Sequence, residues 1–234
     1  WTLLALAFAA GSASAAGDPA AGKSLYATCT ACHGPAGQGN KALNAPKIAG
    51  QEDWYLTRQL QNYKKGIRGT HAGDTYGKQM APMAMTLADD AAIANVVAYI
   101  GTFPDTAPAA TVTGDAARGE TLYKTCIACH GAKGEGNKAL NAPKLTGLSD
   151  WYAVTQLKHF KSGVRGSHAY DTYGKQMAPM SMTLADDKAI MDVVAYINSL
   201  GKQSALARQC GKAPASSGRF FYPEARLTVG RNLL

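Results

Sequence analysis

The sequence predicts an all-α protein built from two tandem copies of one small domain. The main observation is an internal repeat. Residues 41–47 (KALNAPK) recur at 138–144, and residues 77–83 (GKQMAPM) recur at 174–180, so both offsets are 97 positions (138 − 41 and 174 − 77). A period this long exceeds that of a solenoid repeat, so each copy is expected to have its own core. The second observation is that apolar residues recur at helical spacing, while no stretch alternates as a strand.

Three helices are expected in each repeat. The first begins at Asp18-Pro19 and at Gly114-Asp115, because Asp is a preferred N-cap and Pro is favoured at the first helical position. A second helix is expected over about 52–65 and 149–161. The last helix carries an apolar stripe at i, i+3, i+4 and i+7, formed by Ile93, Val96, Val97 and Ile100 and again by Ile190, Val193, Val194 and Ile197. Loops rich in Gly and Pro are expected between these helices.

The remaining segments divide the chain. Residues 1–16 combine an apolar run with an A-x-A-like site at 13–15, which predicts a secretory signal peptide whose start is missing; an uncleaved anchor is the alternative. The two domains are then residues 17–101 and 114–200. Residues 102–113 are rich in Pro, Ala and Thr and form the predicted linker. Residues 201–234 match neither repeat and are interpreted as a basic tail, either disordered or a lineage-specific extension.

The net charge of +8 is concentrated in this tail. Six of the 24 basic residues but only one of the 16 acidic residues follow Leu200, so the tail accounts for +5 and the rest of the chain for +3. No basic patch with interleaved aromatic residues is present, and we therefore exclude a nucleic-acid partner.

Each repeat contains one C-x-x-C-H motif, Cys29-Thr-Ala-Cys32-His33 and Cys126-Ile-Ala-Cys129-His130. This is the attachment signature of c-type haem, in which two thiols add to the haem vinyl groups and the adjacent histidine can bind iron axially. The alternative is a redox dithiol or half of a zinc site, and no further cysteine pairs complete a zinc tetrad. The sequence thus predicts two covalent haem c groups with His33 and His130 as iron ligands. Cys210, the fifth cysteine, is assigned no role.

Each repeat has this motif near its start, a later Met ahead of an L-x-D-D segment, and a final helix that ends in A-Y-I. In these features residues 17–200 resemble the diheme cytochrome c4 family, which has two tandem class I cytochrome c domains. The resemblance implies a few helices wrapped around a covalent haem in each domain, His/Met iron ligation and one-electron transfer in the bacterial periplasm.

Three methionines in each repeat compete for the second axial position. In the family pattern the ligand precedes the Leu of the L-x-D-D segment by seven positions, and Leu87 and Leu184 then point to Met80 and Met177. Both follow Gly-Lys-Gln, which suggests a loop that brings the side chain to the haem. Met83 and Met180 are the alternatives, and Met85 and Met182 are expected to pack. The equivalent His71 and His168 are a further alternative, as bis-histidine ligands. His159, which has Asn62 at the equivalent position, is expected on the surface.

The resemblance also indicates the surroundings of each haem. The carbonyls of Pro46 and Pro143 are the expected acceptors for the ligand histidines. Contacts with the haem edge or propionates are expected from six further residues, for which core packing or solvent exposure is the competing interpretation: Trp54, Tyr55, Arg68, Trp151, Tyr152 and Arg165.

These features predict a periplasmic electron carrier in a respiratory chain and not an enzyme, because a haem ligated by His and Met has no open coordination position. The expected partners are an electron-donor complex and a terminal oxidase. One alternative is a cytochrome subunit docked to a membrane dehydrogenase or oxidase, with peripheral membrane association. The other is a diheme peroxidase, which the near identity of the repeats disfavours.

Overall fold

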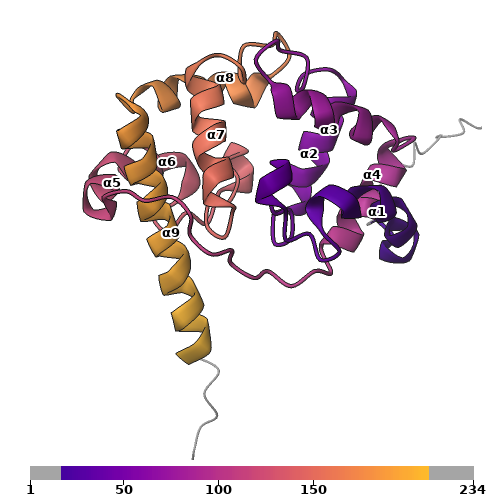
Figure 1. Ribbon diagram of the computed structural model, residues 1–234, viewed down its shortest axis with the longest axis horizontal. Helices are drawn as coiled ribbons and strands as arrows, with labels where there is room; N and C mark the ends of the chain where they lie inside the picture. The colour runs from indigo at the N-terminus through magenta and orange to yellow at the C-terminus, as the bar shows by residue number, and fades with distance from the viewer. Residues whose placement is uncertain (1–16, 211–234) are drawn as a thin grey trace, which may run out of the picture.

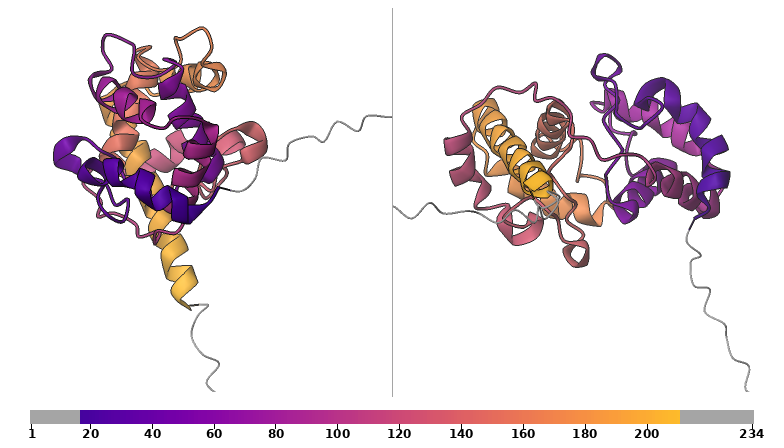
Figure 2. Two further views of the ribbon diagram at one scale, coloured as in Figure 1. Left: turned by 90° about the vertical axis from the view of Figure 1, so that its right-hand side faces the viewer. Right: turned by 90° about the horizontal axis from the view of Figure 1, so that it is seen from below.

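The structure, a computed structural model, describes residues 17–210, with side chains up to Gly201. The predicted signal peptide and residues 211–234 lie outside this range. Two helical lobes lie side by side and are joined by an extended linker (Figures 1 and 2). The part of the chain described contains no β-strand beyond the isolated bridges Asn40–Ala45 and Asn137–Ala142, which confirms the all-α prediction.

The two repeats have matching elements. The first repeat contains α1 (Pro19–His33), the 3-10 turn η1 (Lys41–Leu43), α2 (Asp53–Lys64), α3 (Thr75–Met85) and α4 (Asp90–Ile100). The second contains α5 (Ala116–Tyr123), α6 (Ile127–His130), η2 (Lys138–Leu140), α7 (Asp150–Lys161), α8 (Thr172–Met182) and α9 (Asp187–Cys210).

In each repeat the first and last helices cross at close range. Asp18 and Asp115 cap α1 and α5 as predicted, each accepting a hydrogen bond from the backbone N–H two residues on. Gly22 makes the crossing possible, because a Cβ there would lie 2.0 Å from the carbonyl oxygen of Asn95 in α4; Gly119 meets Asp192 in the same way. The apolar stripes of α4 and α9 are buried in two separate cores, one in each repeat.

Three features differ from the sequence-based expectations. Met80 and Met177 lie in helices α3 and α8, not in loops. The cap explains the first difference: the buried side chain of Asp74 accepts a hydrogen bond from the N–H of Gly77, which starts a helix despite the Gly and Pro residues in it. In the second repeat the first helix is interrupted before the C-x-x-C-H motif, between α5 and α6. Helix α9 continues to Cys210, beyond the predicted start of the tail.

Among the described residues, no single helix has the length and hydropathy needed to cross a membrane. Within residues 17–210, α3 and α4 are the one pair that meets the test when taken together, and they are bent by 111° at the break between them.

The repeats meet in an interface with approximate two-fold symmetry. The backbone N–H of Lys47 donates to Ser149 Oγ at 3.1 Å, and that of the equivalent Lys144 donates to Glu52 Oε2 at 2.8 Å. The linker crosses this interface at Asp105, whose two carboxylate oxygens accept hydrogen bonds from Lys47 Nζ and Lys144 Nζ, both at 2.8 Å. Asp105 thus ties one lysine of each repeat to the linker.

We expect Asp105→Asn to loosen this junction at neutral pH. Burial raises the pKa of Asp105, but the two lysines outweigh it and hold the pKa below its ordinary value. A carboxyl with a lowered folded-state pKa stabilises the fold above its unfolded value, about 3.9, and that contribution is lost as the pH falls through the folded pKa. Thermal unfolding should therefore show the variant less stable at pH 7, with the difference shrinking below about pH 4. Asp187→Asn, which breaks only an exposed ion pair with Lys158, is the control and should change little. An equal effect of both variants would contradict this role.

Candidate haem sites

The C-x-x-C-H motif lies at the end of α1 in the first repeat and in α6 in the second. Both helices end at a glycine with φ 79°, Gly34 and Gly131, which turns the chain away directly after the histidine. A buried tyrosine one turn before the motif fixes this end: Tyr26 Oη donates to Gly34 O at 2.7 Å, and Tyr123 Oη to Gly131 O at 2.8 Å. The motif is thus held in the same conformation twice.

Both motif histidines are oriented as iron ligands require. His33 Nδ1 donates to the carbonyl of Pro46 at 2.8 Å, and His130 Nδ1 to that of Pro143 at 2.8 Å. Nε2 is therefore the ring nitrogen left for a metal. Burial lowers the pKa of both histidines, against smaller opposing contributions from these hydrogen bonds. The rings are therefore neutral near pH 7, which is the form that binds iron.

Each histidine opens into a large, mostly apolar cavity. The first cavity has an empty volume of about 1350 Å³ and the second about 1500 Å³, including their openings to solvent. Cys29, Cys32, His33, Pro46 and Met80 line the first; Cys126, Cys129, His130, Pro143 and Met177 line the second. The predicted haem attachment residues and both predicted ligands therefore share one cavity in each repeat.

The competing ligands divide into two groups. Met83 and Met180 also line the cavities, so the lining alone does not separate them from Met80 and Met177. Met85 and Met182 are 61% and 59% exposed and line neither cavity. The prediction that they pack in the haem pockets is therefore wrong. His71 and His168 line neither cavity; each accepts a backbone hydrogen bond in its own loop, from Gly73 and Tyr170 respectively.

Each cavity is completed by the opposite repeat. Tyr55 and Tyr152 line both cavities, and Trp151 of the second repeat lines the first. Trp54 lines neither; its ring lies 4.8 Å from the guanidinium of Arg58, which also bonds Asn141 across the interface. The tryptophans, although equivalent in sequence, thus have different surroundings.

Arg68 and Arg165 occupy the centre of the interface. Arg68 donates to Gln59 at 2.6 Å and Arg165 to Gln156 at 2.7 Å, and each makes a longer contact of 3.4 Å with the glutamine of the other repeat. Their Nε atoms are buried without a hydrogen-bond partner. A buried arginine donor without a partner is unfavourable, and each arginine lines one cavity. The propionates of a haem would supply the missing acceptors, so these residues fit the group that the motif predicts.

The expectation that His159 lies on the surface is wrong. Its side chain is only 18% exposed, and it reaches from α7 into the lining of the first cavity. Sequence reasoning also missed Tyr26, Tyr123, Gln59 and Gln156 as supporting residues. Their recurrence at equivalent positions was the available signal, but repetition alone does not distinguish cofactor contacts from core packing.

Comparisons with known proteins agree with this geometry. The Cytochrome c family model matches residues 19–104 and 116–201. Cytochrome c4 of Azotobacter vinelandii is 34% identical over 210 residues, covering 85% of this chain and 97% of that protein. A thiosulfate dehydrogenase electron acceptor of Thiomonas intermedia (strain K12) is 36% identical over 176 residues, covering 70% of this chain and 74% of that protein.

The crystal structure of reduced recombinant cytochrome c4 from Pseudomonas stutzeri is similar with a TM-score of 0.60 and 31% identity, covering 78% of this chain and 98% of that one. Two matched haem motifs, two equivalent cavities and relatives similar over nearly their whole length lead to one conclusion. The chain belongs to the cytochrome c4 family, whose members carry two covalently bound haem c groups and transfer electrons.

Proposed function

We propose that this protein is a periplasmic carrier that passes single electrons from a quinol-oxidising complex toward a terminal oxidase. The observation that carries the proposal is the shared lining of the two cavities: Tyr55, Tyr152, Gln59 and Gln156 belong to both. Two haems bound there would be neighbours across one ordered interface, which suits electron transfer within the chain. When bound, each haem supplies an iron that alternates between ferric and ferrous states.

The proposed iron ligands are His33 and Met80 in the first repeat and His130 and Met177 in the second. The proline carbonyls hold the imidazoles, and the arginines at the interface offer donors to the propionates. Both axial positions are filled in this scheme, so the proposal includes no catalytic turnover. The predicted export signal in residues 1–16 supports a periplasmic location.

A second candidate is the electron acceptor of a dehydrogenase. The relative from Thiomonas intermedia, named for that role, supports it. Both functions use the same cavities and differ only in the donor protein.

Rapid mixing of the purified diheme protein distinguishes them. The respiratory proposal expects two-electron oxidation of the reduced protein by membranes that contain a terminal oxidase, and reduction by a quinol-oxidising complex. Reduction only by a thiosulfate dehydrogenase would favour the second candidate. Rapid reaction of the reduced protein with hydrogen peroxide would contradict both, because it requires an open iron.

A further inference from the structure

The two cavities differ in one titratable group. Asn62 of α2 reaches across the interface into the second cavity, and the equivalent residue of α7, His159, reaches into the first. The positions are 97 apart (159 − 62), so the repeat itself supplies the comparison. An amide does not titrate near neutral pH, whereas an imidazole does. At this position, therefore, the first cavity has a side chain that titrates near neutral pH and the second cavity does not.

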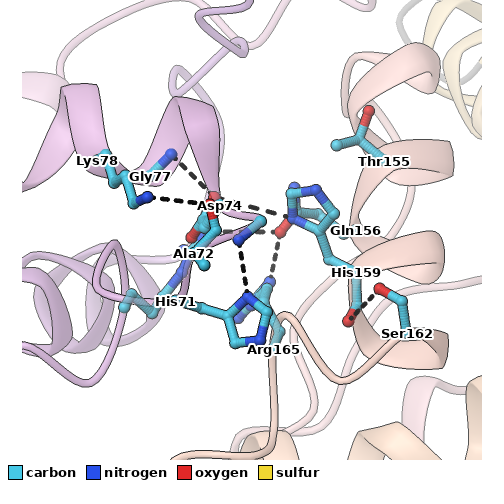
Figure 3. Close-up of polar contacts among 12 residues, drawn as sticks. His71, Ala72, Asp74, Gly77, Lys78, Thr155, Gln156, His159, Ser162 and Arg165 are labelled. Carbon is cyan, nitrogen blue, oxygen red and sulfur yellow. Dashed lines mark hydrogen bonds and ion pairs between the residues drawn. The ribbon is translucent and has the colours of Figure 1, made fainter.

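His159 lies opposite a buried carboxylate of the other repeat. Its Nδ1 is 3.9 Å from Asp74 Oδ1 (Figure 3). This distance is too long for a hydrogen bond but suits an ion pair once the imidazole is protonated. Asp74 is buried and caps α3, the helix that contains Met80. In the second repeat no histidine of the described residues faces the equivalent Asp171, because position 62 is Asn; Oδ2 of Asp171 accepts a backbone hydrogen bond from Gly166 at 3.2 Å.

The charges that face His159 come from both repeats. Burial lowers its pKa below the ordinary value; Asp74 raises the pKa, while Arg165, Arg68 and His71 lower it. The lysines of its own helix are occupied elsewhere: Lys158 pairs with Asp187, and Lys161 donates to the carbonyls of Leu184 and Ala185. The imidazole is therefore neutral near pH 7, with a carboxylate in place to stabilise its protonated form.

We propose that His159 couples proton binding to the first haem: its imidazole binds a proton from solvent when that haem gains an electron. One electron from the donor protein converts ferric to ferrous iron, one proton binds an imidazole nitrogen, and both are released on oxidation. The charge added by the electron is offset by the proton. The inference rests on the proposed electron-carrier function and adds that the two haems differ in their response to pH.

The expected change in the pKa of His159 on haem reduction follows from Coulomb's law. A unit charge about 12 Å away in a medium of effective dielectric constant about 20 moves a pKa by about one pH unit. The pKa of His159 is then higher in the reduced protein than in the oxidised one. By linkage, the potential of the first haem falls as pH rises between these two pKa values and is flat outside them. The potential of the second haem has no such window.

The test uses the full diheme protein. Spectroelectrochemical titration between about pH 4.5 and 8, around the ordinary histidine range, gives both potentials at each pH. Two reversible one-electron steps with methionine–iron bands establish the carrier itself. In the unaltered protein, one potential should fall through a window of about one pH unit. In His159→Asn, which installs the residue of the other repeat, that fall should be lost. His168→Asn, altered at a histidine that is not among the groups that shift the pKa of His159, is the control and should retain it.

Histidine NMR provides a second readout that does not depend on potentials. The pKa of His159 should be higher in the reduced than in the oxidised protein. Asp74→Asn, which keeps an N-cap oxygen, should lower that pKa in both states. Equal pKa values in the two oxidation states, or an unchanged pH dependence in His159→Asn, would overturn the proposal and assign any coupled proton to another group, such as a propionate. Loss of both electron steps would instead contradict the carrier function.

Discussion

Replacing Met80 with alanine is expected to abolish the methionine–iron absorption band of one haem and to lower its potential by on the order of 0.1 V or more, since axial ligands set haem potentials over about 0.8 V. The thioether is a soft, neutral ligand that raises the potential, and alanine offers no replacement. Met177→Ala should do the same for the other haem. Visible spectra and a redox titration of each variant measure both effects.

Met83→Ala is the matched control, because Met83 lies in the same helix and lines the same cavity. It should keep the band and change the potential only slightly. If Met83→Ala loses the band and Met80→Ala retains it, the ligand assignment is reversed. The equivalent pair in the second repeat, Met177 and Met180, repeats the comparison independently.

Replacing Cys29 and Cys32 together with alanine is expected to leave one covalent haem and an unfolded first repeat. The cavity that the haem would fill is lined by core residues, including Leu56, Leu87 and Val96. A core this small cannot tolerate so large a void. Mass spectrometry should show a single haem, and calorimetry should show loss of the transition that belongs to the first repeat.

The same change at Cys126 and Cys129 is the symmetric control and should unfold the second repeat instead. A double variant that still carries two covalent haems would contradict the attachment assignment. A variant with one haem and an intact first repeat would show that the protein part of that core is sufficient by itself.

Much of the fold could be predicted because it depends on local signals that occur twice. The stripes of α4 and α9, and the Asp caps of α1 and α5, are visible in sequence and were confirmed. Helix α3 was missed because Gly77 and Pro82 lower helix propensity. The contact that offsets them, the cap by buried Asp74, depends on tertiary burial.

The part of each site that could be predicted is the haem attachment motif, because its cysteines and histidine are adjacent in the sequence. The C-x-x-C-H motif specifies its own histidine, and the proline carbonyls lie where the resemblance implied. The residues that cross between repeats were not predictable, because one sequence does not show how two domains dock. His159 and Trp151 illustrate this: each was interpreted from its own repeat, but the structure places both in the lining of the other repeat's cavity.

Because each cavity is lined in part by the other repeat, a single repeat produced alone would have an incomplete haem site. A gene fragment that encodes only residues 17–101 would produce a cytochrome whose haem lacks the wall formed by Trp151, Tyr152 and Gln156. Solvent would reach the cavity through the missing wall, and the local dielectric constant would rise, which would change both the potential of a bound haem and the proton affinity of groups beside it. Half-molecules would therefore differ from either half of the intact protein. Maturation has the same constraint: neither cavity has its complete wall until the two halves have docked.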